Sequence, residues 1–94
     1  MVEGKVTTGY ERVSEEFERN FRERGDLGAS FAAVRDGELV VDIWGGTADR
    51  PRRRPWTHDT LQLVLSGTKG MVALCILILI DRGKLDLDKP VRHY

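Results

Sequence analysis

The sequence predicts an α+β fold in which a helix, an antiparallel β-hairpin, a loop and a buried apolar helix follow one another. Three observations lead to this prediction. Apolar side chains recur at helical spacing between residues 10 and 24. Two stretches with high strand preference are joined by Asp36-Gly37, which is among the strongest short hairpin signals. A purely apolar run, Met71 to Ile80, follows Gly70.

The first helix is predicted over residues 10–24, after a lead-in of nine residues that we expect to be loose. Apolar side chains fall three or four apart and would form one face, namely Tyr10, Val13, Phe17 and Phe21. The other face is charged and solvated, and i,i+4 ion pairs are expected there, such as Glu15 with Arg19 and Glu18 with Arg22. Gly25 stands where a helix end favours glycine.

The hairpin is predicted from residues 28–35 and 38–44. The second stretch is rich in residues that favour strands, namely Val40, Val41, Ile43 and Trp44. Small side chains in the first stretch suit a helix packed across the sheet, and they are Ala29, Ala32 and Ala33. Gly45-Gly46 is expected to end the hairpin.

Residues 47–59 are predicted to be a loop that holds a basic run. Arg52, Arg53 and Arg54 stand between two prolines, with Arg50 just before them. A basic run can bind nucleic acid. This one is short, and the 15 basic residues of the chain are balanced by 15 acidic ones. A solvated loop is therefore the preferred interpretation, and neither nucleic acid nor a membrane is expected as a partner.

The apolar helix is predicted over residues 67–82 and ends at Gly83. We expect it to be buried, with Cys75 as a small apolar residue inside it. Residues 85–91 follow as a turn-rich exit. Asp86 and Asp88 in this exit are interpreted as polar turn residues rather than as a catalytic carboxylate pair.

The composition limits the class of protein. A chain of 94 residues with 40% apolar and 32% charged residues suits one small globular domain. One cysteine, no apolar signal core at the N-terminus and no run long enough for a bilayer span lead us to expect a cytoplasmic protein. His58 and His93 are the only histidines, and neither has a partner at metal-ligand spacing. We expect no metal and no cofactor.

The candidate catalytic residues are Ser66 and Lys69, at the start of the apolar helix. Residues three apart share one helix face, so the lysine amine would lie beside the serine hydroxyl and could take its proton. The first-turn amides lack helical partners and could hold an oxyanion. Gly67 and Gly70 lower helix stability there, which suggests a close approach of a backbone or a ligand.

Two alternatives remain open for these residues. Ser66 could be an ordinary helix cap beside a solvated Lys69, a pattern that is frequent by chance. His58 could serve as the base for Ser66, but a loop residue eight positions away needs a specific fold to reach it. We therefore place His58 well below Lys69 as a candidate base.

Four stretches stand in a set order along the chain. They are residues 32–46 with Ala48-Asp49-Arg50, then Asp59-Thr60-Leu61, then Ser66-Gly67-Thr68-Lys69-Gly70, and finally residues 81–91. This combination resembles the N-terminal part of the β-lactamase-like serine hydrolases, which include the penicillin-binding proteins and class C β-lactamases. Within them it looks most like the family VIII carboxylesterases.

The resemblance implies that Ser66 is the acylated nucleophile and that Lys69 accepts its proton or tunes a second base. It also implies that the Ser66 backbone N–H is half of an oxyanion hole. The chain would be the N-terminal piece of the β-lactamase/transpeptidase-like fold, an antiparallel sheet covered by helices. Residues 1–94 would then be one incomplete domain.

Two later motifs of these hydrolases are absent, namely the loop that supplies the second base and the strand that supplies the second oxyanion amide. Neither Tyr10 nor Tyr94 matches the first of them. We therefore expect a fragment of a serine hydrolase that cleaves small carboxylic esters, or amides, and that is inactive as the isolated chain. The alternatives are a non-catalytic remnant or small interaction module and, among enzymes, a β-lactamase or a D-amino-acid peptidase.

Overall fold

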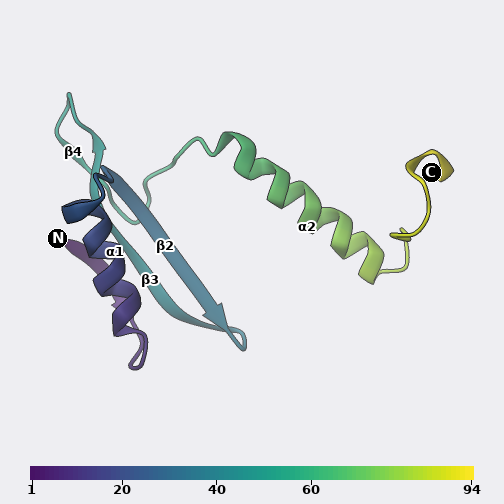
Figure 1. Cartoon of the computed structure of the whole chain (residues 1–94), viewed down its shortest axis with the longest axis horizontal. Coiled ribbons are helices and arrows are strands. Elements are labelled where there is room, and N and C mark those ends of the chain that lie inside the picture. Colours follow the sequence, from purple (N-terminus) through teal and green to yellow (C-terminus); the bar gives the residue numbers. More distant parts are fainter. The chain divides into compact units, whose positions relative to one another are not determined.

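The computed structural model describes all 94 residues, which form two compact units, residues 1–61 and residues 62–94 (Figure 1). The first unit contains β1 (Val2–Val6), α1 (Glu11–Glu23), β2 (Gly28–Arg35), β3 (Glu38–Asp49) and β4 (Arg54–Pro55). The second unit contains two short 3-10 turns, η1 (Leu65–Gly67) and η2 (Val91–His93), on either side of α2 (Thr68–Asp81). The predicted α+β class is confirmed.

The sheet of the first unit is antiparallel, with the order β1-β3-β2 and with β4 paired to the end of β3. The predicted hairpin forms β2 and β3. Asp36 and Gly37 make its turn with φ values of 51° and 81°, as a two-residue turn that matches the twist of the strands requires. A bulge between Ala33 and Val34 shifts the register near this turn.

The core of the first unit lies where α1 crosses one face of the sheet. Val41 and Ile43 of β3 are each 1% exposed, and Phe17 of α1 is buried against them. Phe21 packs edge-on against Phe17, with ring centroids 5.1 Å apart. The apolar face predicted for the first helix is therefore confirmed, and the helix bounds differ from the prediction by one residue at each end. Ala29 and Ala33 also pack against this core, as their small size suggested, whereas Ala32 is exposed.

The expected loose lead-in is wrong, because residues 2–6 form strand β1 along the outer edge of β3. Val2 pairs with Gly45 and Val6 pairs with Val41, and both valines contact the core. Between them Gly4 has φ +112°, a conformation that favours glycine. A short strand with a central glycine has low intrinsic preference, so it forms through its pairing with β3 and not through its own sequence.

The expected hairpin end at Gly45-Gly46 is also wrong, because β3 continues to Asp49. A Cβ atom at Gly45 would lie 2.9 Å from the Met1 carbonyl oxygen and 3.5 Å from Cε2 of Phe21. Gly45 thus lets β1 and α1 come close to β3. The segment expected to be a loop after it is partly a strand, since Thr47 of β3 pairs with Pro55 of β4.

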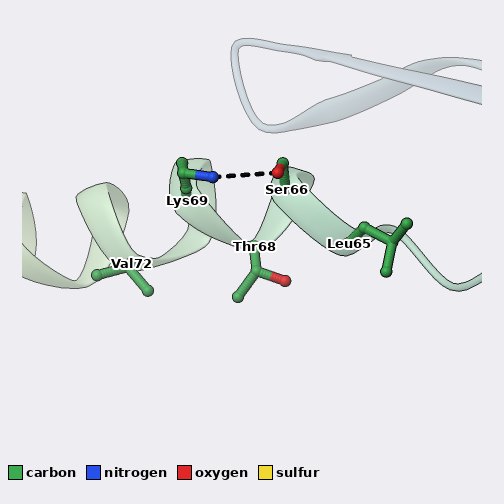
Figure 2. A pocket seen from close by; sticks show the side chains of 5 residues that line it. All are labelled: Leu65, Ser66, Thr68, Lys69 and Val72. Carbon is green, nitrogen blue, oxygen red and sulfur yellow. Dashed lines mark hydrogen bonds between the residues drawn. The ribbon is translucent and has the colours of Figure 1, made fainter.

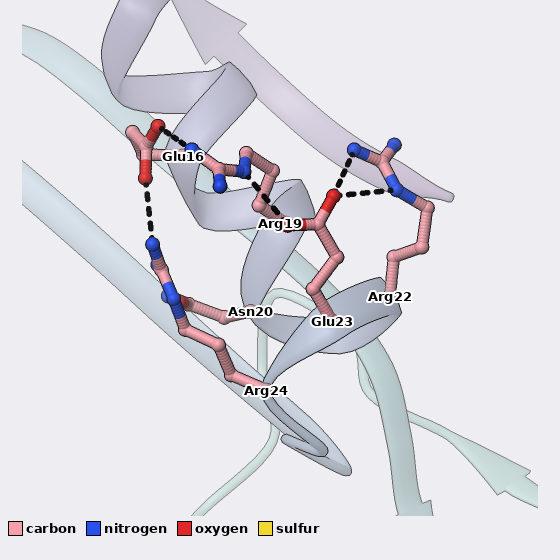
Figure 3. A network of polar contacts seen from close by, with 6 residues as sticks. All are labelled: Glu16, Arg19, Asn20, Arg22, Glu23 and Arg24. Atoms are coloured by element: carbon pink, nitrogen blue, oxygen red, sulfur yellow. Dashed lines mark hydrogen bonds and ion pairs between the residues drawn. The ribbon is translucent and has the colours of Figure 1, made fainter.

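The charged face of α1 is an ion-pair network with pairs different from those predicted (Figure 3). Arg19 lies 2.7 Å from Glu16 and 3.0 Å from Glu23, so one guanidinium contacts a carboxylate on each side along the same helix face. Arg22 contacts Glu23 at 2.9 Å, and Arg24 contacts Glu16 at 3.1 Å. The expected pairs of Glu15 with Arg19 and Glu18 with Arg22 do not form. Hydrogen bonds from Arg19 and Arg24 lower the pKa of Glu16.

The second unit is dominated by α2, which matches the helix predicted over residues 67–82. Its end is marked by Gly83, which has φ +68° and donates a backbone hydrogen bond of 2.9 Å to Ile80. The turn-rich exit is confirmed as well, since the Asp88 N–H donates to a side-chain oxygen of Asp86 at 3.0 Å. Neither helix reaches the combined length and apolarity that a membrane span needs.

The expected burial of this helix is not found in the isolated chain. None of its side chains is buried, and Met71 and Leu77 are 61% and 53% exposed. Cys75, which we expected to be buried, is exposed. The apolar side chains surround the helix on all sides, and its own unit offers only two short turns to pack against.

Candidate active site

The candidate site is built where η1 runs directly into α2. Ser66 lies in the 3-10 turn, and Lys69 lies in the first turn of the helix, three residues later. Lys69 Nζ donates a hydrogen bond of 3.0 Å to Ser66 Oγ. Figure 2 shows the two side chains on the same side of the helix, with Thr68 on the other side. The structure thus brings together the two residues that the sequence analysis singled out.

Ser66 does not act as the helix cap that we considered as an alternative. The residue at the cap position is Gly67, and no side chain caps the helix. The Ser66 hydroxyl is instead bonded to the Lys69 amine. The first-turn amides of α2 therefore have no side-chain partner, and the positive end of the helix dipole lies next to the hydroxyl.

The backbone just before Ser66 is strained. Leu65 has φ +44°, in the left-handed region that L-residues other than asparagine and aspartate rarely adopt. Such a conformation costs about 1–2 kcal/mol, so surrounding contacts must hold it. One of these is the hydrogen bond of 2.9 Å from the Gly67 N–H to the Val64 carbonyl. A Cβ atom on Gly67 would lie only 3.3 Å from Cβ of Val64, so a larger residue at this position would require the Val64 side chain to shift.

Gly70 differs from Gly67, although both glycines lower the intrinsic stability of the helix. A Cβ atom at Gly70 would meet no atom within 4 Å. Nothing in this chain therefore requires a glycine at that position.

A shallow, open pocket of about 480 Å³ surrounds the pair, and most of its lining is apolar. It is lined by Leu65, Ser66, Thr68, Lys69 and Val72. An exposed hydroxyl beside an amine can attack a carbonyl carbon, and the positive end of the helix dipole favours the oxyanion that forms. The open pocket leaves room for a substrate or for further protein.

His58, the alternative base, is engaged within the first unit. Its Nδ1 lies 3.1 Å from an Asp59 oxygen, and its Nε2 lies 3.5 Å from an Asp42 oxygen. The ring also packs edge-on against Trp44, with centroids 5.0 Å apart. These contacts account for the position of the imidazole without Ser66. No group of three His, Cys, Asp or Glu side chains is arranged to hold a metal ion.

The sequence pattern does not predict the strained residue Leu65 or the role of its neighbour Val64. Leucine is among the residues least expected at positive φ, and no turn motif marks the position. The only signal available is the apolar approach from Leu61 to Leu65 directly before a serine, which does not indicate backbone geometry.

Comparison with known proteins finds similar proteins both by sequence and by structure. Residues 17–94 match the family model described as Beta-lactamase. The chain is 46% identical over 67 residues to the Esterase/beta-lactamase LipL of Mycobacterium tuberculosis, covering 71% of this chain and 16% of that protein. It is 41% identical over 83 residues to Esterase EstB of Burkholderia gladioli, covering 88% of this chain and 21% of that protein.

The structural comparison agrees. The chain resembles the crystal structure of a family VIII carboxylesterase with a TM-score of 0.83 and 42% sequence identity, over 92% of this chain and 23% of that one. The chain thus spans between 16% and 23% of the length of these three relatives.

Proposed function

Because this chain belongs to the beta-lactamase family, we propose that it is the nucleophile-bearing part of a serine hydrolase that acts on small carboxylic esters. Its homology to esterases and β-lactamase-like serine hydrolases supports the reaction class. The observation that carries the proposal is the hydrogen bond of 3.0 Å between Lys69 Nζ and Ser66 Oγ. Esters are favoured over β-lactams because EstB and the solved relative are described as esterases.

The geometry supports a two-step acyl transfer. Lys69, which must be neutral for this step, takes the proton from Ser66 Oγ as that oxygen attacks the ester carbonyl carbon. The tetrahedral oxyanion is stabilised by backbone amides, including the Ser66 N–H that the family resemblance implies. The ester C–O bond then breaks, and the alcohol leaves with a proton from Lys69. Water attacks the acyl-serine in the same way, which releases the carboxylic acid and restores Ser66.

In our proposal, residues 1–94 are part of a single larger β-lactamase-like domain. The exposed apolar side chains of α2 support this, since a helix that is apolar all round is normally buried on every side. The rest of that domain would cover α2 and supply a second base and a second oxyanion amide. The isolated chain should therefore turn over no ester.

The test is a chimaera in which this chain replaces the matching segment of the family VIII carboxylesterase. Hydrolysis of a p-nitrophenyl ester is measured for the chimaera and for its Ser66→Ala and Lys69→Met variants. We expect each variant to lose at least about a thousandfold in kcat, because nucleophile and base act as one unit. Ser30→Ala, a serine in the sheet, is the matched control and should keep the parent rate. A Ser66→Ala variant that hydrolyses at the parent rate would exclude Ser66 as the nucleophile.

The rival proposal is a non-catalytic chain, and the exposure of α2 favours it for the isolated protein. Labelling with a fluorophosphonate probe separates the two. A reactive Ser66 in the isolated chain, absent in Ser66→Ala, would contradict the rival proposal. A labelled chimaera together with an unlabelled isolated chain would support a site that needs the rest of the domain.

A further inference from the structure

The tip of the β3–β4 hairpin holds positive charge that the proposed hydrolysis does not use. Its four arginines are all exposed, namely Arg50, Arg52, Arg53 and Arg54. Figure 1 shows this hairpin projecting past the end of the sheet in the first unit. Its backbone is ordered, since the Arg53 N–H donates to the Arg50 carbonyl at 3.1 Å and Arg54 pairs with Asp49. The arginines are therefore displayed from a defined turn.

One of the four guanidinium groups is neutralised within the hairpin. Asp49 Oδ2 lies 2.7 Å from Arg52 Nη1, and Asp49 Oδ1 accepts the Arg52 backbone N–H at 3.1 Å. Hydrogen bonds from Arg52 lower the pKa of Asp49. Arg50, Arg53 and Arg54 make no direct ion pair, although the positive charge of Arg54 also helps to lower the pKa of Asp49. Arg19 and Arg22 of α1 and Arg24 just after it, in contrast, are paired with glutamates within the chain.

The rest of the first unit limits what could bind this tip. Residues 1–61 contain twelve acidic and ten basic residues, so the unit outside the tip is acidic. A long polyanion such as duplex DNA or an anionic membrane would be repelled beyond the tip. The neighbouring Trp56 has its indole nitrogen buried, and the tip itself contains no aromatic side chain for stacking on bases.

A short run of carboxylates fits these limits. The Asp49–Arg52 contact already shows a carboxylate bound at this turn through both of its oxygens. We propose that the β3–β4 tip docks a short acidic peptide segment of a partner protein through Arg50, Arg53 and Arg54. This docking is independent of ester hydrolysis and of Ser66.

The experiment uses the full chain and a fluorescent oligoglutamate peptide, with binding followed by anisotropy at low and high salt. The test variant carries Arg50→Gln, Arg53→Gln and Arg54→Gln. The matched control removes the same charge elsewhere, with Arg12→Gln, Lys84→Gln and Lys89→Gln. We expect binding to weaken about tenfold in the test variant and less than about twofold in the control, with salt weakening the wild-type complex.

Each other outcome would overturn the proposal. Equal losses in both variants would mean that net charge alone attracts the peptide. Tighter binding of a short DNA duplex or of phosphatidylglycerol vesicles at matched charge would assign the tip to nucleic acid or to a membrane. Unchanged peptide binding in the test variant, with an unchanged circular dichroism spectrum, would place the site elsewhere.

Discussion

At the scale of single residues, the candidate site depends on a backbone that most sequences avoid. Leu65 holds φ +44° directly before Ser66, whereas the other two non-glycine residues at positive φ, Asp36 and Arg53, lie in hairpin turns. A strained residue persists only where its surroundings fix it. We infer that this turn fixes the direction in which the Ser66 hydroxyl points.

Replacing Leu65 by glycine tests this inference. Glycine adopts positive φ without strain, but it also lets the turn sample other conformations. In the chimaera, Leu65→Gly should lower kcat about tenfold while changing the free energy of unfolding by no more than about 1 kcal/mol. Leu65→Ala keeps the strain and removes only the side chain, so its kcat should stay within about threefold of the parent. If both variants lose the same activity, the leucine side chain and not the backbone is what matters.

Gly70 allows a second residue-scale prediction. Its missing Cβ faces open space in the isolated chain, so Gly70→Ala should stabilise α2 by about 0.5–1 kcal/mol through helix propensity. Helix content measured by circular dichroism during urea unfolding reports this gain. In the chimaera the same change should bring no gain if the covering part of the domain approaches Gly70. A loss of helix in the isolated chain would contradict the open space seen beside Gly70.

At the scale of elements, the sequence predicted the helices and strands whose residue pattern alone favours that structure. The apolar side chains of α1 recur at helical spacing, and Asp36-Gly37 strongly favours a tight turn. Strand β1 has no such signal, because Gly4 interrupts it and β3 supplies its stability. Gly45-Gly46 looked like a strand end because its role, a close approach of β1 and α1, depends on contacts distant in sequence.

The ion pairs of α1 predict how the first unit responds to acid. Hydrogen bonds from Arg19 and Arg24 lower the pKa of Glu16 from 4.5. Hydrogen bonds from Arg22 and Arg19 lower the pKa of Glu23 in the same way. A carboxyl with a lowered pKa contributes stability that is present above its unfolded pKa and is lost as pH falls through its folded pKa. Stability should thus fall modestly as pH drops below 4.5.

This is measured by urea unfolding followed through tryptophan fluorescence, since both tryptophans lie in the first unit. Glu16→Gln should show a smaller loss between neutral pH and about pH 3 than the parent chain. Glu15→Gln, on the same helix but without an ion pair, is the control and should show the parent loss. Identical acid responses in all three proteins would show that the network does not contribute.

At the scale of the whole molecule, the sequence predicted the pairing of Ser66 with Lys69 but not the surroundings of α2. Helical spacing alone brings residues three apart together, so local geometry sufficed for the pair. Burial depends on what packs against the helix, and the apolar run indicates only a need for partners. Cys75, expected inside, is therefore exposed in this chain.

Cys75 is a probe of whether α2 becomes covered. In the isolated chain its thiol should react with a small thiol reagent at the rate of an exposed cysteine, without denaturant. In the chimaera the reaction should slow by at least about a hundredfold, because access then needs local unfolding. Equally fast reaction in both proteins would show that the rest of the domain does not cover this part of α2.

The even distribution of apolar side chains around α2 has a further consequence. A helix with one polar stripe resists spinning about its long axis, because turning would drive charges inward. Between Gly70 and Ile80, α2 carries no charged side chain, so almost nothing in this segment fixes its rotation about the helix axis. Its azimuth inside a domain would be set by Ser66 and Lys69 at one end and Asp81 at the other. The residues proposed for chemistry would therefore also fix the rotation of α2 about its axis. Replacing them with apolar residues should make that rotation less well defined.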